Sequence, residues 1–268
     1  MTNVAGTPVG RRSRPFAIDA VVFGAGRGVR LRPLTDTLPK VLVPVCGRPL
    51  LDYHLAALQE VGIRRVALVV SYRADQIRAH LGDGASYGLD LHYVLQPSPR
   101  GTGDALRVAR SEIRSDPFVV CYADVFFPDE AAILRDVLAN DRPKIVAARV
   151  EDAGSYGRLI TTTQEGREVL VDIVEKDGRP TSALVNAGLY LLPSHLWDLV
   201  DRLTPSPRGE YELTDAVRSF VKGGGTIEVV EARAWVDIGS PESLRRAVEL
   251  AQRTDPRVAR AGLDPPLR

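Results

Sequence analysis

The sequence predicts an α/β protein built on a mostly parallel central sheet. Its 268 residues are within the range of one large domain that can bury a substantial core. Apolar strand-like runs alternate with helix-like segments as far as residue 143, which is typical of parallel strands joined by right-handed crossovers. Beyond that point, strand-like runs follow one another with turns between them. We therefore expect a parallel first half and an α+β second half.

Local signatures support each element of the first half. Residues 18–23 form an apolar run that breaks into glycines, as a buried strand does where it enters a loop. Residues 50–60 place Leu51, Leu55 and Leu58 on one helical face, and Gly62 follows that helix. Similar patterns predict strands at residues 66–70, 91–95 and 118–122 and helices at 74–81 and 105–113.

The second half is richer in strands. Its apolar runs predict strands at residues 145–150, 159–163, 169–175 and 184–192, helices at 195–202 and 213–221, and a short strand pair at 226–230 and 234–236. A last helix is expected to begin at Pro241, because proline is well tolerated in a first turn. We expect this half to close over the first.

Charge and composition argue against several classes of protein. A net charge of +1 and a pI near 7.8 give no reason to expect a nucleic-acid partner. The 2 cysteines provide no disulfide framework or metal cluster, and no apolar run is long enough to cross a membrane. These features predict a cytoplasmic protein without a membrane partner. We divide it into a flexible arm at residues 1–16, a main domain at 17–250 and a tail at 251–268.

A loop rich in glycine and arginine follows the first strand. Gly24, Gly26 and Gly28 leave backbone N–H groups unshielded, and Ala25 lies between them. Cations surround the same turn, with no acid between residues 24 and 35: Arg27, Arg30, Arg32 and Lys40. The loop therefore predicts a phosphate site. Its spacing matches neither the P-loop nor the dinucleotide fingerprint.

Residues 26–49 carry a long spaced motif, G-R-G-V-R-L-R-P-L-T followed by P-K-V-L-V-P-V-C-G-R-P. It resembles the signature of the sugar-1-phosphate nucleotidyltransferases, also called NDP-sugar pyrophosphorylases. The resemblance implies a Rossmann-like, GT-A-like fold with a nucleotide half at residues 17–143 and a sugar half at 144–240. It also implies transfer of a nucleotidyl group from an NTP to a sugar 1-phosphate, as in glucose-1-phosphate thymidylyltransferases and uridylyltransferases.

A second loop, at residues 96–105, resembles the segment with which this family reads the base, Q-x-x-P-x-G-T-x-x-A. The resemblance implies that the Gln96 amide faces the pyrimidine edge and that Gly101 and Thr102 lie against the nucleotide. Glutamine offers a donor and an acceptor together, which matches the O4 and N3–H groups of uracil or thymine. We therefore expect UTP or dTTP in preference to GTP.

Two aspartates are the expected metal ligands. Asp124 follows the fourth strand, and ligand sites in open α/β sheets lie beyond the carboxyl ends of strands. The segment resembles the family's metal-binding Gly-Asp, with Ala123 in place of the usual glycine. Asp237 lies in W-V-D-I-G, which resembles the family's W-x-D-x-G. The resemblance implies that Asp124 and Asp237 hold Mg²⁺, a cation that prefers carboxylates and substrate phosphates.

The sugar site is expected from three further segments that resemble the family. By this resemblance, the sugar-binding residues are Gly157, Glu175, Lys176, Asn186 and Gly188. We assign Glu212 and Asp215 a structural role instead, because acids in a helix's first turn complement its dipole. The four histidines are read as ordinary residues.

The expected catalytic residues are therefore Arg30, Lys40, Asp124, Lys176 and Asp237. Arg30 and Lys40 would hold the triphosphate, and Lys176 would direct the sugar phosphate toward the α-phosphorus. Alternatives are the same chemistry with GTP or a cyclitol phosphate, and a catalytically silent nucleotide-sugar sensor, for which Val29 and Ala123 are the departures from the family pattern. The family also suggests a homo-oligomer.

Overall fold

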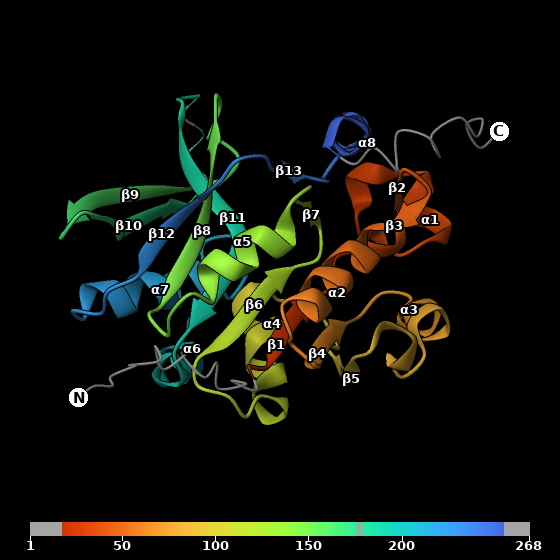
Figure 1. The fold of residues 1–268 in the computed structure, drawn as a ribbon, viewed down its shortest axis with the longest axis horizontal. Helices are drawn as coiled ribbons and strands as arrows, with labels where there is room; N and C mark the ends of the chain where they lie inside the picture. The colour runs from red at the N-terminus through yellow and green to blue at the C-terminus, as the bar shows by residue number, and fades with distance from the viewer. Residues whose placement is uncertain (1–17, 176–177, 179, 255–268) are drawn as a thin grey trace, which may run out of the picture.

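The computed structural model describes residues 18–175, 178 and 180–254, which form a nine-stranded sheet with helices on its faces (Figure 1). The strand order is β5-β4-β1-β6-β11-β8-β12-β10-β9. These strands are β1 Ala20–Phe23, β4 Arg65–Val70, β5 Asp90–Leu95, β6 Phe118–Tyr122, β8 Lys144–Val150, β9 Gly157–Gln164, β10 Arg167–Glu175, β11 Ala183–Leu192 and β12 Glu228–Ala232. The α-helices are α1 Leu34–Thr37, α2 Leu50–Glu60, α3 Ala74–Leu81, α4 Thr102–Ala109, α5 Glu130–Val137, α6 Trp197–Asp201, α7 Leu213–Lys222 and α8 Pro241–Thr254.

The parallel first half is confirmed. β5, β4, β1 and β6 are parallel neighbours, and helices cover both of their faces. Alternate residues of β1 enter different cores, because successive strand side chains point to opposite faces. Val22 packs in the core that includes residues of α2, α3 and α5, whereas Val21 packs in the core that includes residues of α4, α6 and α7. The helix α5, which Figure 1 shows across the near face, is an addition to the predicted elements.

The sheet as a whole is mixed and not mostly parallel as predicted, because the strands of the second half, which was expected to be α+β, pair mainly antiparallel. β11 joins β6 antiparallel, and the sheet continues through β8, β12, β10 and β9 with one parallel contact, between β12 and β8. β9 also pairs with β11, through Val185 and Arg158, so these five strands curl into a barrel-like ring. The second half therefore extends the first sheet and does not close over it as a separate layer.

The length of the connections between strands explains why the first half is parallel and the second half is mainly antiparallel. Only Glu165 and Gly166 separate β9 from β10, and both have positive φ, 49° and 76°. Such a two-residue turn joins antiparallel strands, whereas parallel neighbours need a crossover of about a dozen residues. Strands joined by short turns therefore indicate antiparallel pairing.

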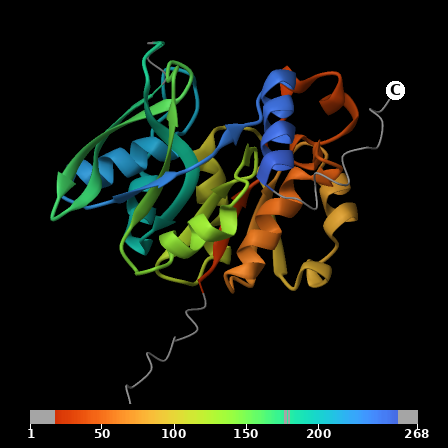
Figure 2. The ribbon, with the colours of Figure 1, turned by 45° about the horizontal axis from the view of Figure 1, so that its top comes forward.

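The expected strand pair near residues 226–236 is also wrong. β12 lies between β8 and β10, whereas β13 (Val236–Asp237) pairs antiparallel with β7 (Val125–Phe126) in a separate ribbon. The helix α8 packs on this ribbon and on β2 (Pro44–Val45), which pairs with β3 (Arg48–Pro49). Figure 2 shows α8 beside the N-terminal part of the chain. The helix α8 spans Pro241–Thr254, a range that includes the expected domain boundary at residue 250, and the division into domains stays a prediction.

Two other predictions concern the ends of the chain. The arm at 1–16 and the tail beyond residue 254 lie outside the described residues. Within the described ranges, none of the helices combines the length and the apolar character that are needed to cross a bilayer.

Candidate active site

A cavity of about 470 Å³ lies where β1, β5 and β6 end and reaches across to the barrel-like half. It brings together residues that are far apart in the sequence. The predicted site residues that line it are Ala25, Gly26, Arg30, Lys40, Gln96, Gly101, Thr102, Asp124, Gly157, Glu175, Asn186, Gly188 and Asp237. The predicted Lys176 lies outside the described residues.

Gly24 and Gly28 shape the phosphate loop and are not among the cavity-lining residues. The Gly24 N–H donates to Val69 O at 2.8 Å, which ties the start of the loop to the neighbouring strand. Gly28 has a φ of 64°, and a Cβ there would lie 2.9 Å from the Thr35 side chain. Glycine is required at this turn because it has positive φ and no room for a side chain. Contact of Gly24 and Gly28 with a nucleotide stays a prediction.

Lys40 and Asp124 form an ion pair inside the cavity. Lys40 is 6% exposed, and its Nζ lies 2.7 Å from Asp124 Oδ2. Burial acts to raise the pKa of Asp124, but Lys40, a backbone hydrogen bond and His54 together hold that pKa below its ordinary value. The pair therefore presents a carboxylate and an ammonium to the cavity at neutral pH.

The β7–β13 ribbon brings the two aspartates together. Asp237 is the pairing partner of Val125, and the Ile238 N–H donates to Asp124 O at 2.9 Å. Arg30 lies beside them, because its guanidinium is 2.8 Å from the place that a Cβ of Gly239 would occupy. Glycine at position 239 thus leaves room for this cation.

The two carboxylates fit a magnesium ion that also binds substrate. In the described ranges, acids, histidines and cysteines form no group of three that could enclose a metal on their own. Mg²⁺ is usually held by one or two carboxylates, with phosphate oxygens and water completing its shell. Asp124 and Asp237, both lining one cavity, correspond to that pattern.

His54 forms a hydrogen bond with the β7 strand of the β7–β13 ribbon. It is fully buried, with Nδ1 2.8 Å from Glu130 Oε1 and Nε2 2.9 Å from Val125 O. The carbonyl can only accept, so Nε2 carries a proton. Burial acts to lower the pKa of His54, but the Glu130 carboxylate, with the Val125 carbonyl and Asp124, raises that pKa. His54 is outside the cavity lining, and its reading as an ordinary residue stays a prediction.

The loop at residues 96–105, which is predicted to read the base, is fixed to the segment before α7. The Gly103 N–H donates to Tyr211 O at 2.7 Å, and the Tyr211 N–H donates to Arg100 O at 2.8 Å. Gly101 has a φ of 100°, and a Cβ there would lie 2.5 Å from Tyr211 O. A side chain at position 101 would therefore separate the two segments.

The structure corrects the reading of Gln96 as a combined donor and acceptor. Its Nε2 donates to Gly101 O at 3.2 Å and to Asp104 Oδ2 at 2.9 Å. Both amide hydrogens are thus used within the protein, and only Oε1 remains for a ligand.

The strands of the barrel-like half provide the expected sugar side. Gly157 and Glu175 pair between β9 and β10, and a Cβ at 157 would lie 2.9 Å from Glu175 Oε1. On β11, the Gly188 N–H donates to Asn186 Oδ1 at 3.0 Å. Gly188 has a φ of 84°, and a Cβ there would lie 2.8 Å from the Tyr122 ring. These glycines keep the cavity wall close to the backbone.

Several cavity residues escaped the sequence analysis. Glu212, which was expected to be structural, lines the cavity as well as binding Arg208 at 2.7 Å, whereas Asp215 is not part of the lining. Burial raises the pKa of Tyr122 to about 12, so its phenol stays protonated. The unassigned residues that line the cavity include Tyr122, Ser155, Tyr156, Glu210, Thr214 and Trp235. Tyr122, Tyr156 and Trp235 each lie within two residues of a predicted site residue, and this closeness in sequence could have identified them as cavity residues.

Comparison with known proteins finds related sequences and structures. A glucose-1-phosphate thymidylyltransferase from Streptomyces griseus is 33% identical over 242 residues, which are 89% of this chain and 67% of that protein. A crystal structure assigned as a glucose-1-phosphate thymidylyltransferase from Bacillus anthracis superposes with a TM-score of 0.77 at 27% identity, covering 88% of this chain and 95% of that one. A UDP-glucose pyrophosphorylase in complex with UDP-glucose has the same fold, with a TM-score of 0.78 at 23% identity over 89% of this chain and 99% of that one.

The chain matches only part of each curated relative. The chain spans between 52% and 67% of the length of the curated relatives compared with it. The profile of the family described as nucleotidyl transferase matches residues 19–254. This range includes every described residue of the cavity. The chain therefore belongs to the nucleotidyl transferase family.

Proposed function

We propose that this protein transfers a nucleotidyl group from an NTP to a sugar 1-phosphate and releases pyrophosphate. The observation that carries the proposal is the meeting of Asp124, Asp237, Arg30 and Lys40 in one cavity. Two carboxylates beside two cations are what a magnesium-bound triphosphate requires. The family of the chain and the names of its relatives support the same reaction.

The chemistry needs little from the protein except charge and alignment. A phosphate oxygen of the sugar 1-phosphate attacks the α-phosphorus, and a new P–O bond forms. The bond from that phosphorus to the α–β bridging oxygen breaks, and its electron pair leaves with pyrophosphate. The attacking phosphate is largely dianionic at neutral pH, so it needs no general base.

Each charged residue then has a defined task. Arg30 and Lys40 neutralise the triphosphate and the departing pyrophosphate, which is stabilisation of charge by groups already in place. Asp124 and Asp237 would hold Mg²⁺, which supplies further positive charge to the phosphates when bound. The predicted task of Lys176 is to direct the sugar phosphate.

The barrel-like half supports a hexose as the acceptor. Glu175 and Asn186 line the cavity there, and such groups hydrogen-bond to sugar hydroxyls. We propose dTTP or UTP as the donor, in line with the substrates in the names of the relatives. Guanine also presents an N–H on its pairing edge, so GTP is the second candidate donor.

The departures from the family pattern do not favour a silent sensor. Val29 is 55% exposed, and Ala123 is buried with its N–H bonded to Phe23 O at 3.1 Å. Neither residue is among those that line the cavity.

The test is pyrophosphate release with Mg²⁺ across UTP, dTTP, GTP, ATP and CTP, each against a panel of sugar 1-phosphates. We expect turnover with dTTP or UTP and one hexose 1-phosphate. An empty grid would contradict catalysis. Thermal stabilisation by a nucleotide sugar without turnover, worth about 2.7 kcal/mol at a hundred times its dissociation constant, would indicate a sensor.

A further inference from the structure

A buried carboxylate lies directly behind the expected base reader. Asp104 is 1% exposed and Gln96 is 2% exposed, and their side chains are joined by the 2.9 Å bond from Gln96 Nε2 to Asp104 Oδ2. The other carboxylate oxygen, Asp104 Oδ1, accepts from Arg100 Nη2 at 2.8 Å. Asp104 is thus held on both sides and belongs to the first turn of α4.

These contacts determine which end of the Gln96 amide is which. The partners on one side are a carboxylate oxygen and the Gly101 carbonyl, and both accept hydrogen bonds. The NH₂ group must face them, because a carbonyl oxygen in its place would meet two acceptors. An exchange of the two ends would leave buried acceptors without donors, which is unfavourable.

The opposite end of the amide borders the cavity. Gln96 is one of the residues that line it. No donor from the described part of the chain bonds to Oε1, and this atom is not among the buried polar atoms that lack a partner. The protein therefore presents a fixed acceptor to whatever enters.

We infer that Asp104 is a specificity-determining positioning residue, which locks the Gln96 amide so that only its carbonyl oxygen faces the base. The inference rests on the proposed function, because it assumes that a nucleotide base lies at Gln96. A fixed acceptor suits a base that brings an N–H, as uracil and thymine do at N3. Cytosine brings an acceptor at N3 and is rejected. Gln96 alone does not distinguish uracil from guanine, whose N1 also carries a hydrogen.

The test is the binding of UTP and CTP to Asp104→Asn, measured by calorimetry without sugar phosphate. An asparagine can turn its own NH₂ group toward Gln96. The Gln96 amide can then reverse, at the loss of its 3.2 Å bond to Gly101 O, and offer a donor to cytosine N3. We expect the preference for UTP over CTP to fall by about tenfold, mainly through tighter CTP binding. The pair dTTP and dCTP should change in the same direction.

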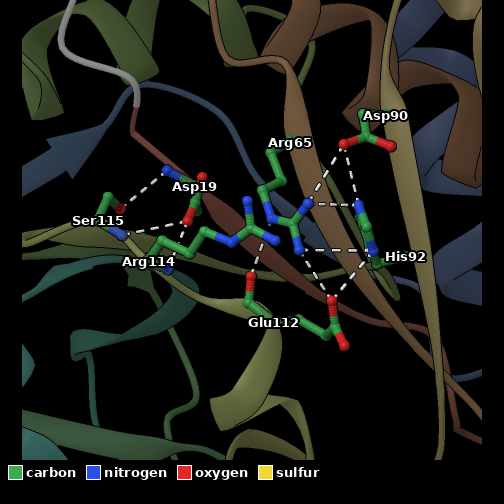
Figure 3. A network of polar contacts seen from close by, with 7 residues as sticks. All are labelled: Asp19, Arg65, Asp90, His92, Glu112, Arg114 and Ser115. Carbon is green, nitrogen blue, oxygen red and sulfur yellow. Dashed lines mark hydrogen bonds and ion pairs between the residues drawn. The ribbon is translucent and has the colours of Figure 1, made fainter.

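Asp19→Asn is the matched control. Asp19 is also a buried aspartate, 5% exposed, and its Oδ2 accepts the N–H groups of Arg114 and Ser115 at 2.6 and 3.1 Å (Figure 3). It precedes β1, whereas Gln96 follows the parallel β5, so the two lie at opposite ends of the sheet. This variant should lose stability and keep the wild-type ratio of UTP to CTP.

A double-mutant cycle separates positioning from direct contact. In a Gln96→Leu background, Asp104→Asn should leave the UTP to CTP ratio unchanged, because no amide remains to be oriented. A ratio that changes equally in both backgrounds would overturn the inference. A loss of affinity that is equal for all nucleotides in Asp104→Asn would overturn it as well.

A measurement on the wild-type protein covers the case in which Asp104→Asn does not fold. The Gln96 side-chain amide protons, assigned by their loss in Gln96→Leu, should exchange with solvent far more slowly than exposed glutamine amides. Fast exchange would contradict the lock. Turnover in the NTP grid tests the proposed function separately, because a locked amide and an inactive enzyme can be observed independently.

Discussion

The parallel and the barrel-like halves of this protein build one cavity by different means. In the parallel half, the site residues lie in loops after strands: Ala25 to Lys40 after β1, Gln96 to Thr102 after β5, and Asp124 after β6. In the barrel-like half, Gly157, Glu175, Asn186 and Gly188 lie on the strands themselves. Parallel strands gather their loops at one edge of a sheet, whereas a curled antiparallel sheet offers a face.

The two halves should differ in where they tolerate substitutions. The loops of the parallel half are held by backbone contacts such as that between Gly103 and Tyr211. The barrel-like half is held by its strand pairing, and its cavity wall depends on which side chains project from it. The following four predictions test this distinction, from the largest effect to the smallest.

The largest effect is expected from the buried pair His54–Glu130, which supports the parallel half. Removal of one partner by His54→Ala leaves a buried charge without its partner, and this should cost about 3–5 kcal/mol in the free energy of unfolding. Urea denaturation measures it. The double variant His54→Leu/Glu130→Leu should recover most of the loss, because it removes both polar groups. Equal instability of the single and double variants would contradict this account.

The next largest effect is expected at two aspartates that come from different parts of the chain. Asp124 belongs to the parallel half and Asp237 comes from the segment after β12, yet both should serve one metal-bound triphosphate. Replacement of either by alanine should lower kcat by roughly 10²–10³. Asp201→Asn, which removes an exposed partner of Arg110, is the control and should retain activity. A variant of Asp237 with near wild-type turnover would remove it from the proposed site.

Substitution of one glycine in each half should raise the KM of a different substrate. Gly101→Ala places a Cβ against Tyr211 O and should raise the KM for the NTP, whereas Gly188→Ala places one against the Tyr122 ring and should raise the KM for the sugar phosphate. Strain of this kind costs about 1–3 kcal/mol, which corresponds to roughly 5–150-fold in KM. Gly209→Ala has a similar φ, 78°, with no atom within 4 Å of its Cβ, and should change neither KM. Equal effects of Gly101→Ala and Gly188→Ala on both substrates would contradict the division.

The smallest effect concerns the ion pair between Asp172 on β10 and Arg218 on α7, at 2.6 Å. Burial acts to raise the pKa of Asp172, but Arg218, the Ile173 N–H and Lys222 together lower that pKa below its ordinary value of 3.8. A lowered pKa contributes stability above the unfolded value, and that contribution is lost as the pH falls through the folded value. Asp172→Asn should therefore cost about 0.2–1 kcal/mol at pH 7 and nothing near pH 2, as measured by urea denaturation. A difference that persists at pH 2 would exclude the ion pair as its cause.

Local signals were sufficient for most of the secondary structure. Strands β1, β4, β5 and β6 and helices α2, α3 and α7 lie within a few residues of their predicted positions. The helix α5 was missed, although Ile133, Leu134 and Val137 have helical spacing. The pairing of β13 with β7 could not be predicted, because it joins segments about a hundred residues apart through backbone bonds that leave no pattern in the sequence.

Similar limits apply to the site. The loop motifs predicted Arg30, Lys40, Gln96, Asp124 and Asp237 as members of one site, and the fold brings all five to one cavity. The orientation of the Gln96 amide could not be predicted, because it depends on the buried position of Asp104.

The sequence by itself determined the residue types, the parallel first half and the family resemblance, because these depend on spacing along the chain. Only the tertiary structure decided that the second half continues the same sheet and that His54 bonds to the β7–β13 ribbon. It also decided that Gln96 keeps only Oε1 for a ligand. Hydrogen bonds and ion pairs between distant segments are set by three-dimensional packing, and one buried partner such as Asp104 changes what a motif residue can offer.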